Sequence, residues 1–235
     1  MIYVVLPTYN EADNLMRLMT ELLALPVNLK VLVVDDNSPD GTGALADTLA
    51  TQHAGRVHVI HRAGKQGLGT AYIAGFRRAF ELGADFILTM DADFSHPPPV
   101  IPMMVAESAT ADVVIGSRYV AGGRMESLAR RRLLSRMANA LAHFVLGLKA
   151  RDVTAGFRLY RRRVLESVPL EKIFSSGYSF LIEMLYLVER RGWRVAEVPI
   201  VYRDRVLGES KISQNEIYKA MYTVARLAFR RVRGK

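Results

Sequence analysis

The first half of the chain alternates short apolar runs with segments of helical periodicity. The apolar runs are residues 2–6, 30–35, 57–61, 85–90 and 112–116. Strands that are covered on both faces read as continuous apolar runs, and strands that alternate with helices build parallel sheets. This alternation predicts an α/β protein with a Rossmann-like, mostly parallel sheet that is flanked by helices.

The helices between these runs can be located from their periodicity. Asn10 is expected to cap a helix that starts at Glu11 and has an apolar stripe, formed by Leu15, Leu18, Met19 and Leu22. Further helices are expected from the turn at 37–41 to about residue 52, over 70–82 and over 97–108.

Polar residues stand where several predicted strands end. They are residues 7–10, the pair Asp35 and Asp36, and the segment 91–93, which reads Asp-Ala-Asp. Ligands of doubly wound sheets bind beyond the carboxyl ends of the strands. Two neighbouring carboxylates are costly without a cation, and their oxygens suit Mg²⁺ or Mn²⁺. The alternatives are solvated acids at 91–93 and a helix cap at 35–36.

Several classes of protein are excluded by what the sequence lacks. It has no cysteine, which excludes disulfide scaffolds, cysteine zinc sites and cysteine nucleophiles. It has no phosphate-binding P-loop, no Gly-x-Ser-x-Gly elbow and no His-Glu-x-x-His motif. His96 is interpreted as a turn or supporting residue rather than a metal ligand. The longest uncharged runs, 94–106 and 137–148, are shorter than the roughly 20 apolar residues of a membrane span.

The charge of the chain is divided unevenly along its length. Residues 1–116 have a net charge of −6, whereas residues 117–163 have +10 and residues 203–235 have +6. Of the 32 basic residues 25 are arginine, whose planar guanidinium suits phosphate. The division favours a cation site in the first half and an anion site in the second. A solvated basic surface and a nucleic-acid-binding module are the alternatives.

The second half is less regular than the first. A strand is expected at 155–161, a helix at 179–190, and a strand at 195–202 that Pro199 interrupts. Two basic amphipathic helices are expected at 132–148 and 213–233, and each could be part of the core or lie in the plane of a membrane surface. No linker or repeat divides the sequence, so we expect a single domain over residues 1–235.

Eight motifs follow one another in a specific order. They are Leu-Pro-Thr-Tyr-Asn-Glu at 6–11, Asp-Asp-Asn-Ser-Pro-Asp-Gly-Thr at 35–42, Gly-Leu-Gly-Thr-Ala-Tyr at 67–72, Met-Asp-Ala-Asp-Phe-Ser-His at 90–96, Gly-Ser-Arg-Tyr at 116–119, Asp-Val-Thr-Ala-Gly-Phe-Arg at 152–158, Gly-Tyr-Ser-Phe at 177–180 with Glu-Met at 183–184, and Val-Pro-Ile at 198–200 with Arg205 and 208–211. Together they resemble the inverting family 2 glycosyltransferases, and among them the polyprenol (dolichol) phosphate mannose synthases. The segment 122–130 departs from that family because it has no tryptophan and is about one residue short.

The resemblance implies a GT-A-type fold and a specific reaction. Mannose would pass from GDP-mannose to a polyprenyl (dolichyl) monophosphate with inversion, assisted by Mg²⁺ or Mn²⁺. The acceptor is already an anion, so it needs orientation more than a general base. Another nucleotide sugar, such as UDP-glucose, or another acceptor is the alternative within the fold. Nucleic acid is a remote alternative, because the acidic residues stand where the ligand is expected.

The resemblance also implies a role for individual residues. The nucleotide-sugar-binding half would be 1–120 and the acceptor-binding half 121–235. The nucleotide sugar would contact Pro7, Tyr9, Glu11, Asp36, Asp91 and Ala92. Asp91 and Asp93 would hold the metal, and the acceptor phosphate would contact Arg118, Arg131, Ser135 and Arg205. The residues expected to be catalytic are Asp93, Arg118 and Arg205.

The acceptor lipid also implies a location. Many relatives continue into a membrane domain, whereas this sequence stops at Lys235, so we expect the soluble type without a transmembrane domain. The protein would be cytoplasmic and associated peripherally with the cytosolic face of a membrane, through its basic segments. Whether a separate small membrane protein serves as an anchor is left open by the sequence.

Overall fold

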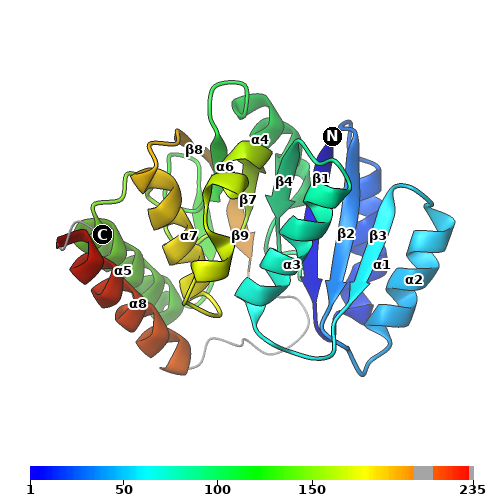
Figure 1. Cartoon of the computed structure of the whole chain (residues 1–235), viewed down its shortest axis with the longest axis horizontal. Helices are drawn as coiled ribbons and strands as arrows, with labels where there is room; N and C mark the ends of the chain where they lie inside the picture. Colours follow the sequence, from blue (N-terminus) through cyan, green and yellow to red (C-terminus); the bar gives the residue numbers. More distant parts are fainter. Residues whose placement is uncertain (204–213, 233–235) are drawn as a thin grey trace.

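A seven-stranded sheet forms the centre of the molecule (Figure 1). The structure, a computed structural model, describes residues 1–203 and 214–232, and it describes residues 130, 131, 134, 214–217 and 232 without their side chains. The strand order is β3-β2-β1-β4-β7-β5-β8. The bounds are β1 Ile2–Thr8, β2 Leu29–Asp35, β3 Val57–His61, β4 Phe86–Thr89, β5 Val113–Ser117, β7 Arg158–Arg161 and β8 Val195–Pro199.

The sheet is parallel except for one strand. β7 is antiparallel to both of its neighbours, β4 and β5, and every other pairing is parallel. Since β4 and β5 are each antiparallel to β7, they point the same way, and their carboxyl ends lie at one edge of the sheet. The predicted mostly parallel sheet is confirmed.

Helices cover both faces of this sheet, and each face has its own apolar core. Successive residues of β1 point to opposite faces, so Tyr3 and Val5 belong to one core while Val4 and Leu6 belong to the other. The first core includes residues of α3 (Leu68–Glu81), α6 (Arg162–Ser167) and α7 (Ser179–Arg190). The second includes residues of α1 (Ala12–Leu23), α2 (Thr42–Gln52) and α4 (Ile101–Glu107). Two short 3-10 turns, η1 (Pro98–Val100) and η2 (Leu170–Lys172), complete these layers.

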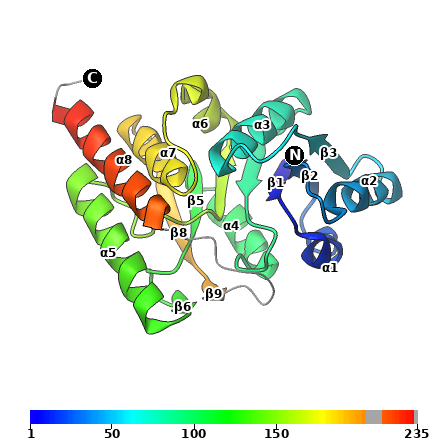
Figure 2. The same cartoon turned by 90° about the horizontal axis from the view of Figure 1, so that it is seen from below.

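Two long helices lie side by side beyond α7 (Figures 1 and 2). They are α5 (Ala129–Leu146) and α8 (Gln214–Val232), close to the predicted bounds. α5 ends at Gly147, whose φ of 65° is a left-handed conformation that favours glycine. Among the described residues, no helix has both the length and the apolar character needed to cross a membrane.

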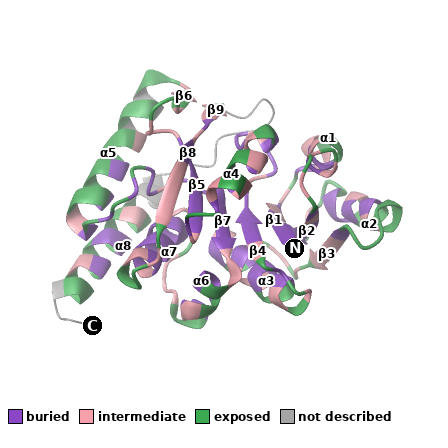
Figure 3. Cartoon of the chain, turned by 90° about the horizontal axis from the view of Figure 1, so that it is seen from above, coloured by how far each residue is buried: buried purple, intermediate pink, exposed green. Residues whose placement is uncertain are grey.

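The sequence left open whether the apolar stripe of α5 is part of the core or faces a membrane surface, and in the structure most of this stripe is outside the core. Leu133, Met137 and Leu141 are exposed, and the helix packs through Asn139, Ala142 and Leu146 instead. Figure 3 shows that most of α5 is exposed, with a few buried positions along it. Asn139 can be buried because its amide makes four hydrogen bonds, one to Ser135 O of the same helix and three to residues 153 and 154. Apolar periodicity therefore located the helix correctly and left open what covers its apolar face.

The structure also contains a two-stranded sheet that was not predicted from the sequence. It pairs β6 (Arg124–Glu126) with β9 (Val201–Arg203) in parallel. The predicted strand at 195–202 is indeed interrupted at Pro199, where β8 ends, and β9 then joins this other sheet. Two three-residue strands have too little periodicity to be recognised in a sequence.

Candidate functional site

Three loops at the carboxyl edge of the sheet contain the first group of predicted residues. They follow β1, β2 and β4, and each has one non-glycine residue with a left-handed backbone: Asn10 (φ 59°), Asn37 (φ 57°) and Phe94 (φ 62°). Asparagine tolerates this conformation, whereas a bulky phenylalanine rarely adopts it. Such strain concentrates at functional sites, where the surrounding structure holds it in place.

The loops after β1 and β2 are joined by hydrogen bonds. The backbone N–H groups of Asn10 and Glu11 donate to Ser38 Oγ (3.1 Å) and Thr42 Oγ1 (2.9 Å). The N–H of Ala12 donates to Asp40 Oδ2 at 3.1 Å. The prediction that Asn10 caps α1 is therefore wrong, because the neighbouring loop supplies acceptors to these amides and the helix begins at Ala12.

The two carboxylates at the end of β2 have different environments. Asp35 is buried and accepts hydrogen bonds from Thr8 Oγ1 (3.1 Å) and from the N–H (3.0 Å) and Oγ (2.6 Å) of Ser38, so it organises the loop. Asp36 forms an ion pair with Arg62 at 2.7 Å. Burial raises the pKa of Asp36 above its ordinary value, and Arg62 offsets part of that rise. Because α2 is capped at Gly41, the alternative that the acids at 35–36 cap it is wrong.

The loop after β3 also reaches this edge, which the sequence did not indicate. Arg62 pairs with Asp36, and the Nζ atom of Lys65 lies 4.5 Å from the ring centre of Tyr9. Two predicted residues, Tyr9 and Asp36, therefore each contact a cation of the β3–α3 loop. The only signal in the sequence was that loop's position after an apolar strand.

The Asp-Ala-Asp turn after β4 is held by His96. The N–H of Asp91 donates to Nδ1 of His96 at 2.9 Å, and the imidazole stacks on Phe157 with ring centres 5.2 Å apart. Since a backbone N–H can only donate, Nδ1 acts as an acceptor and is occupied. This geometry agrees with the interpretation of His96 as a supporting residue. Asp93 is buried and accepts a hydrogen bond from the N–H of Ser95 at 3.1 Å.

The donor set of this turn suits a metal that a substrate helps to bind. The described residues include no group of three histidine, aspartate or glutamate side chains able to hold an ion. Mg²⁺ commonly binds one or two carboxylates and takes its remaining ligands from water and substrate phosphates. Asp91 and Asp93 fit that arrangement.

The second group of predicted residues lies beyond β5. Arg118 is bound by Asp152 through two parallel hydrogen bonds, from Nε (2.8 Å) and from Nη2 (2.6 Å), and Nη2 also donates to Thr154 Oγ1 (2.8 Å). Burial lowers the pKa of Arg118, but the adjacent Asp152 raises it more, so the guanidinium stays charged. The Nη1 atom has no described hydrogen bond and is the part of Arg118 that can address a ligand.

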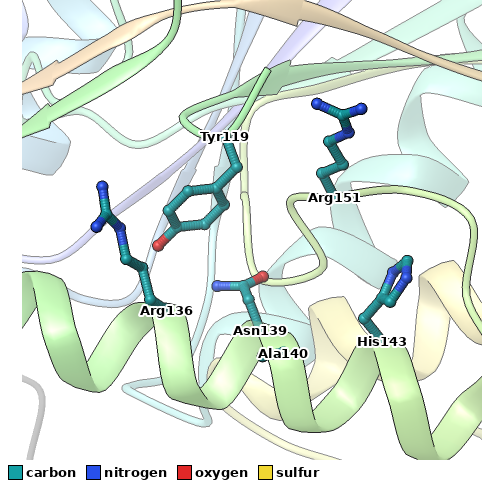
Figure 4. A pocket seen from close by; sticks show the side chains of 6 residues that line it. All are labelled: Tyr119, Arg136, Asn139, Ala140, His143 and Arg151. Carbon is teal, nitrogen blue, oxygen red and sulfur yellow. The ribbon is translucent and has the colours of Figure 1, made fainter. Parts of the chain in front are cut away.

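Two cavities lie along the side of α5 that faces Tyr119. One, of about 210 Å³, is lined by Arg118, Tyr119, Gly123, Arg124, Met125, Arg132 and Arg136. The other, of about 240 Å³, is lined by Tyr119, Arg136, Asn139, Ala140, His143 and Arg151 (Figure 4). Ser135 lies beside them, with its hydroxyl 2.8 Å from that of Tyr119. The side chain of Arg131 and the whole of Arg205 lie outside the described residues.

Several residues of the smaller cavity were not predicted from the sequence. Arg124, Arg132 and Arg136 join Arg118 there. The spacing of four between Arg132 and Arg136, which places both on one face of a helix, was an available signal. Asp152, which fixes Arg118, begins the motif at 152–158, but nothing in the sequence indicated that it pairs with a residue 34 positions away.

The two groups of residues lie at the same edge of the sheet. Asp93 follows β4 and Arg118 follows β5, and only β7 separates these strands. Adjacent strands are about 4.8 Å apart, so the strand ends are separated by roughly 10 Å. The sheet therefore brings an acidic turn and an arginine-lined cavity within the reach of one elongated substrate pair.

This α/β architecture, with acidic loops at the carboxyl edge, is that of the GT-A glycosyltransferases. The chain belongs to glycosyl transferase family 2, whose family model matches residues 3–168. It is 46% identical over 229 residues to polyprenol monophosphomannose synthase of Mycolicibacterium smegmatis, covering 97% of this chain and 86% of that protein. It is 44% identical over 223 residues to undecaprenyl-phosphate mannosyltransferase of Micrococcus luteus, covering 94% and 91%.

Solved structures are similar in fold at low sequence identity. Glucosyl-3-phosphoglycerate synthase of Mycobacterium tuberculosis, crystallised with Mn²⁺, UDP and phosphoglyceric acid, matches with a TM-score of 0.71 and 21% identity over 97% of this chain and 78% of that chain. A complex of the same enzyme with Mg²⁺ and UDP matches with a TM-score of 0.70 and 20% identity, over 97% and 79%. These structures confirm the predicted fold, and the family model and the two mannosyltransferase relatives confirm the predicted enzyme class.

Proposed function

We propose that the protein transfers mannose from GDP-mannose to a polyprenyl monophosphate and inverts the anomeric carbon. The observation that carries this proposal is the acidic turn and the arginine-lined cavity at one edge of the sheet. The first suits a nucleoside diphosphate with its cation, and the second suits a phosphate acceptor. The names of the two mannosyltransferase relatives support mannose as the sugar and a polyprenyl phosphate as the acceptor.

The acidic side would bind the sugar donor and a divalent cation. Asp91 and Asp93 would hold Mg²⁺ or Mn²⁺, which supplies a Lewis acid for the leaving diphosphate. The other contacts proposed for the nucleotide sugar are Pro7, Tyr9, Glu11, Asp36 and Ala92. The hydrogen bonds between the β1 and β2 loops support this assignment, because they fix the backbone of residues 10–12 against the loop that contains Asp36.

The arginine side would bind and orient the acceptor phosphate. Arg118 would use Nη1, while Asp152 holds the rest of its guanidinium in place. Arg131, Ser135 and Arg205 complete the proposed contacts. An oxygen of the acceptor phosphate attacks the anomeric carbon directly and displaces the diphosphate, so a single displacement inverts the linkage. Because the attacking oxygen is already anionic, no residue has to remove a proton.

The outer helices support a peripheral position at the cytosolic face of a membrane. Leu133, Met137, Leu141 and Phe144 form an exposed apolar stripe on α5, and Tyr218, Tyr222 and Phe229 form another on α8. Both helices also have arginines, which anionic headgroups attract. We expect sedimentation with anionic vesicles at low salt and release in about 0.5 M NaCl. Binding that is equally strong to neutral vesicles would instead assign the attachment to apolar insertion or to a small anchoring protein.

The proposal is tested by the choice of sugar donor. Radiolabelled GDP-mannose and UDP-glucose are each offered with a polyprenyl monophosphate and Mg²⁺, and the lipid product is extracted. We expect label from GDP-mannose in a β-linked polyprenyl-phosphate-mannose that is split by mild acid. Transfer from UDP-glucose alone would favour the alternative sugar donor, and transfer from neither would refute the proposal.

The same assay tests how the chain is divided. We propose that residues 1–120 serve the nucleotide sugar and residues 121–235 serve the acceptor, within a single domain. Apart from Arg118, which the proposal assigns to the acceptor phosphate, substitutions in the first half should then raise the KM for the sugar donor, and substitutions in the second half should raise the KM for the lipid. A mixture of both effects in either half would contradict this division.

A further inference from the structure

Two arginines beside α5 have no counter-ion in the described part of the chain. Many of the other described arginines are held by carboxylates, as Arg62 is by Asp36, Arg118 by Asp152 and Arg163 by Asp112. No described residue accepts a hydrogen bond from the side chain of Arg136 or Arg151. Both line the 240 Å³ cavity, and Figure 4 shows them above α5, on either side of the cavity.

The other residues that line this cavity are hydrogen-bonded within the chain or apolar, so Arg136 and Arg151 are its main groups for binding a ligand. The amide of Asn139 is saturated, since it donates to Ser135 O and Thr154 Oγ1 and accepts from the N–H groups of residues 153 and 154. His143 uses Nδ1 toward Ala150 O, at 3.2 Å. Ala140 contributes only a methyl group. Two guanidinium groups around a hollow of this size are suited to a phosphate ester.

The cavity is next to the exposed apolar stripe of α5. Arg136, Ala140 and His143 lie on one stripe of the helix, with spacings of four and three. The neighbouring stripe contains Met137, 60% exposed, and Phe144, 88% exposed. A ligand whose anionic group enters the cavity would therefore direct an attached hydrocarbon chain along α5.

We propose that this cavity binds the headgroup of one anionic phospholipid, and that it is a different site from the one for the acceptor. The inference rests on the proposed function only in assigning the acceptor phosphate to the 210 Å³ cavity around Arg118. Tyr119 and Arg136 line both cavities and so lie between the two sites. One bound phospholipid would hold α5 at the membrane surface beside the acceptor.

The test uses Arg151→Gln and the matched variant Arg77→Gln. Both residues are exposed, and Arg77 lies on α3, so each substitution removes one surface charge. The probe is dihexanoyl phosphatidylglycerol below its critical micelle concentration, titrated by calorimetry. Dihexanoyl phosphatidylcholine and inorganic phosphate are the comparison ligands.

We expect saturable binding of the phosphatidylglycerol with one site per chain. Arg151→Gln should weaken the binding of phosphatidylglycerol about tenfold, because one charge-assisted hydrogen bond is lost. Arg77→Gln should leave the binding unchanged. Equal losses in both variants, equal binding of phosphatidylcholine, or no saturation would overturn the proposal. Inorganic phosphate that binds as tightly as the lipid would assign the cavity to a free anion and would also overturn it.

A transfer assay separates this site from that of the acceptor. A short, water-soluble polyprenyl phosphate is used without phospholipid, and the melting temperature of each variant is recorded. Arg151→Gln should keep the wild-type KM for this acceptor. A KM raised severalfold would show that the cavity belongs to the acceptor, which refutes the inference and not the mannose transfer. A wild-type protein that binds the phosphatidylglycerol and transfers no mannose would refute the proposed function alone.

Discussion

The loops after β1, β2 and β4 and the surface around α5 differ in how their polar groups are used. In the loops, Asp35 and Asp40 bind neighbouring hydroxyl and N–H groups, and Asp36 has a cation beside it. Around α5, Arg136 and Arg151 face a hollow, and Phe144 is exposed to solvent. The first region is built from contacts within the chain, whereas the arginines of the second have no described carboxylate partner and are open to solvent and to an external ligand. This difference is expected of an enzyme that binds a small nucleotide in a preformed site and a lipid at a membrane surface.

The largest effect should come from the acidic turn. Asp93→Asn removes one charge from the proposed metal site, so transfer should fall about a thousandfold, as when a group that stabilises transition-state charge is lost. The exposed Asp13→Asn on α1 is the matched control and should be nearly neutral. Initial rates with and without EDTA measure the effect. Wild-type activity that persists in EDTA would show that no cation is required.

The second-largest effect is expected at Arg118, the cation that Asp152 holds in place. Arg118→Lys keeps the charge and loses the two parallel bonds to Asp152, which is fully buried. Transfer should fall about a hundredfold, and the free energy of unfolding should fall by about 2 kcal/mol. Arg203→Lys, in an exposed pair with Glu126, should change neither quantity measurably. Wild-type rates for Arg118→Lys, Arg131→Lys and Arg205→Lys would refute the assignment of all three to the acceptor.

Substitutions of His96 test whether its side chain orients the turn that contains Asp91 and Asp93. His96→Leu removes the acceptor of the Asp91 N–H, so the Mn²⁺ concentration for half-maximal activity should rise about tenfold, as for other groups that orient metal ligands. His96→Asn can place an amide oxygen near the position of Nδ1 and should recover most of that loss. Direct Mn²⁺ binding, followed by electron paramagnetic resonance, separates this effect from a change in turnover. Equal losses in the two variants would mean that the ring matters only for packing on Phe157.

Exposed apolar side chains allow a direct comparison of the two regions. Phe144→Ser on α5 should weaken binding to anionic vesicles about tenfold, since one large apolar side chain would no longer leave water. Met16→Ser on α1, also exposed, should have no effect. Sedimentation with vesicles measures both variants. Equal binding by Phe144→Ser and the wild type would exclude the α5 stripe from the contact.

The smallest effect concerns the pH dependence of stability. The folded pKa of Asp36 is raised above the ordinary value of 3.8, so its protonated form is favoured in the folded state. Its contribution to stability is present below that value and is lost as pH rises through the folded pKa. Urea unfolding of the wild type and Asp36→Asn between pH 3.5 and about 7 should therefore show the wild type losing stability relative to the variant. A difference that moves the opposite way would mean that Arg62 outweighs burial.

The sequence predicted the central sheet and its acidic edge well. Continuous apolar strands and the acids that follow them are local features, and the parallel topology then determines that their ends meet. Asp91 and Asp93 could be proposed as a pair for this reason, and His96 as their support. The start of α1 was predicted less well, because its amides are bound by Ser38, Asp40 and Thr42 of another loop.

The region around Arg118 and α5 could be predicted only in part. Arg118 was identified by resemblance, but its partner Asp152 and the arginines beside it depend on tertiary contacts. The strands β6 and β9 pair residues 77 positions apart at Glu126 and Arg203, and periodicity contains no information on such pairing. What covers the apolar stripe of α5 was left open, because helical periodicity identifies an apolar face without stating whether protein or lipid covers it.

The antiparallel strand β7 has a consequence for how acceptor specificity can evolve. β5 ends at Ser117, β7 begins at Arg158, and the two strands are hydrogen-bonded neighbours. Everything between them, α5 and both of its cavities included, leaves the sheet and returns to it at adjacent positions. A segment with such closely spaced ends can be lengthened, shortened or replaced with little disturbance to the strands that anchor it. On the proposed function, the strands and the acidic loops could thus be kept while the α5 segment between them was exchanged for one that suits a different acceptor.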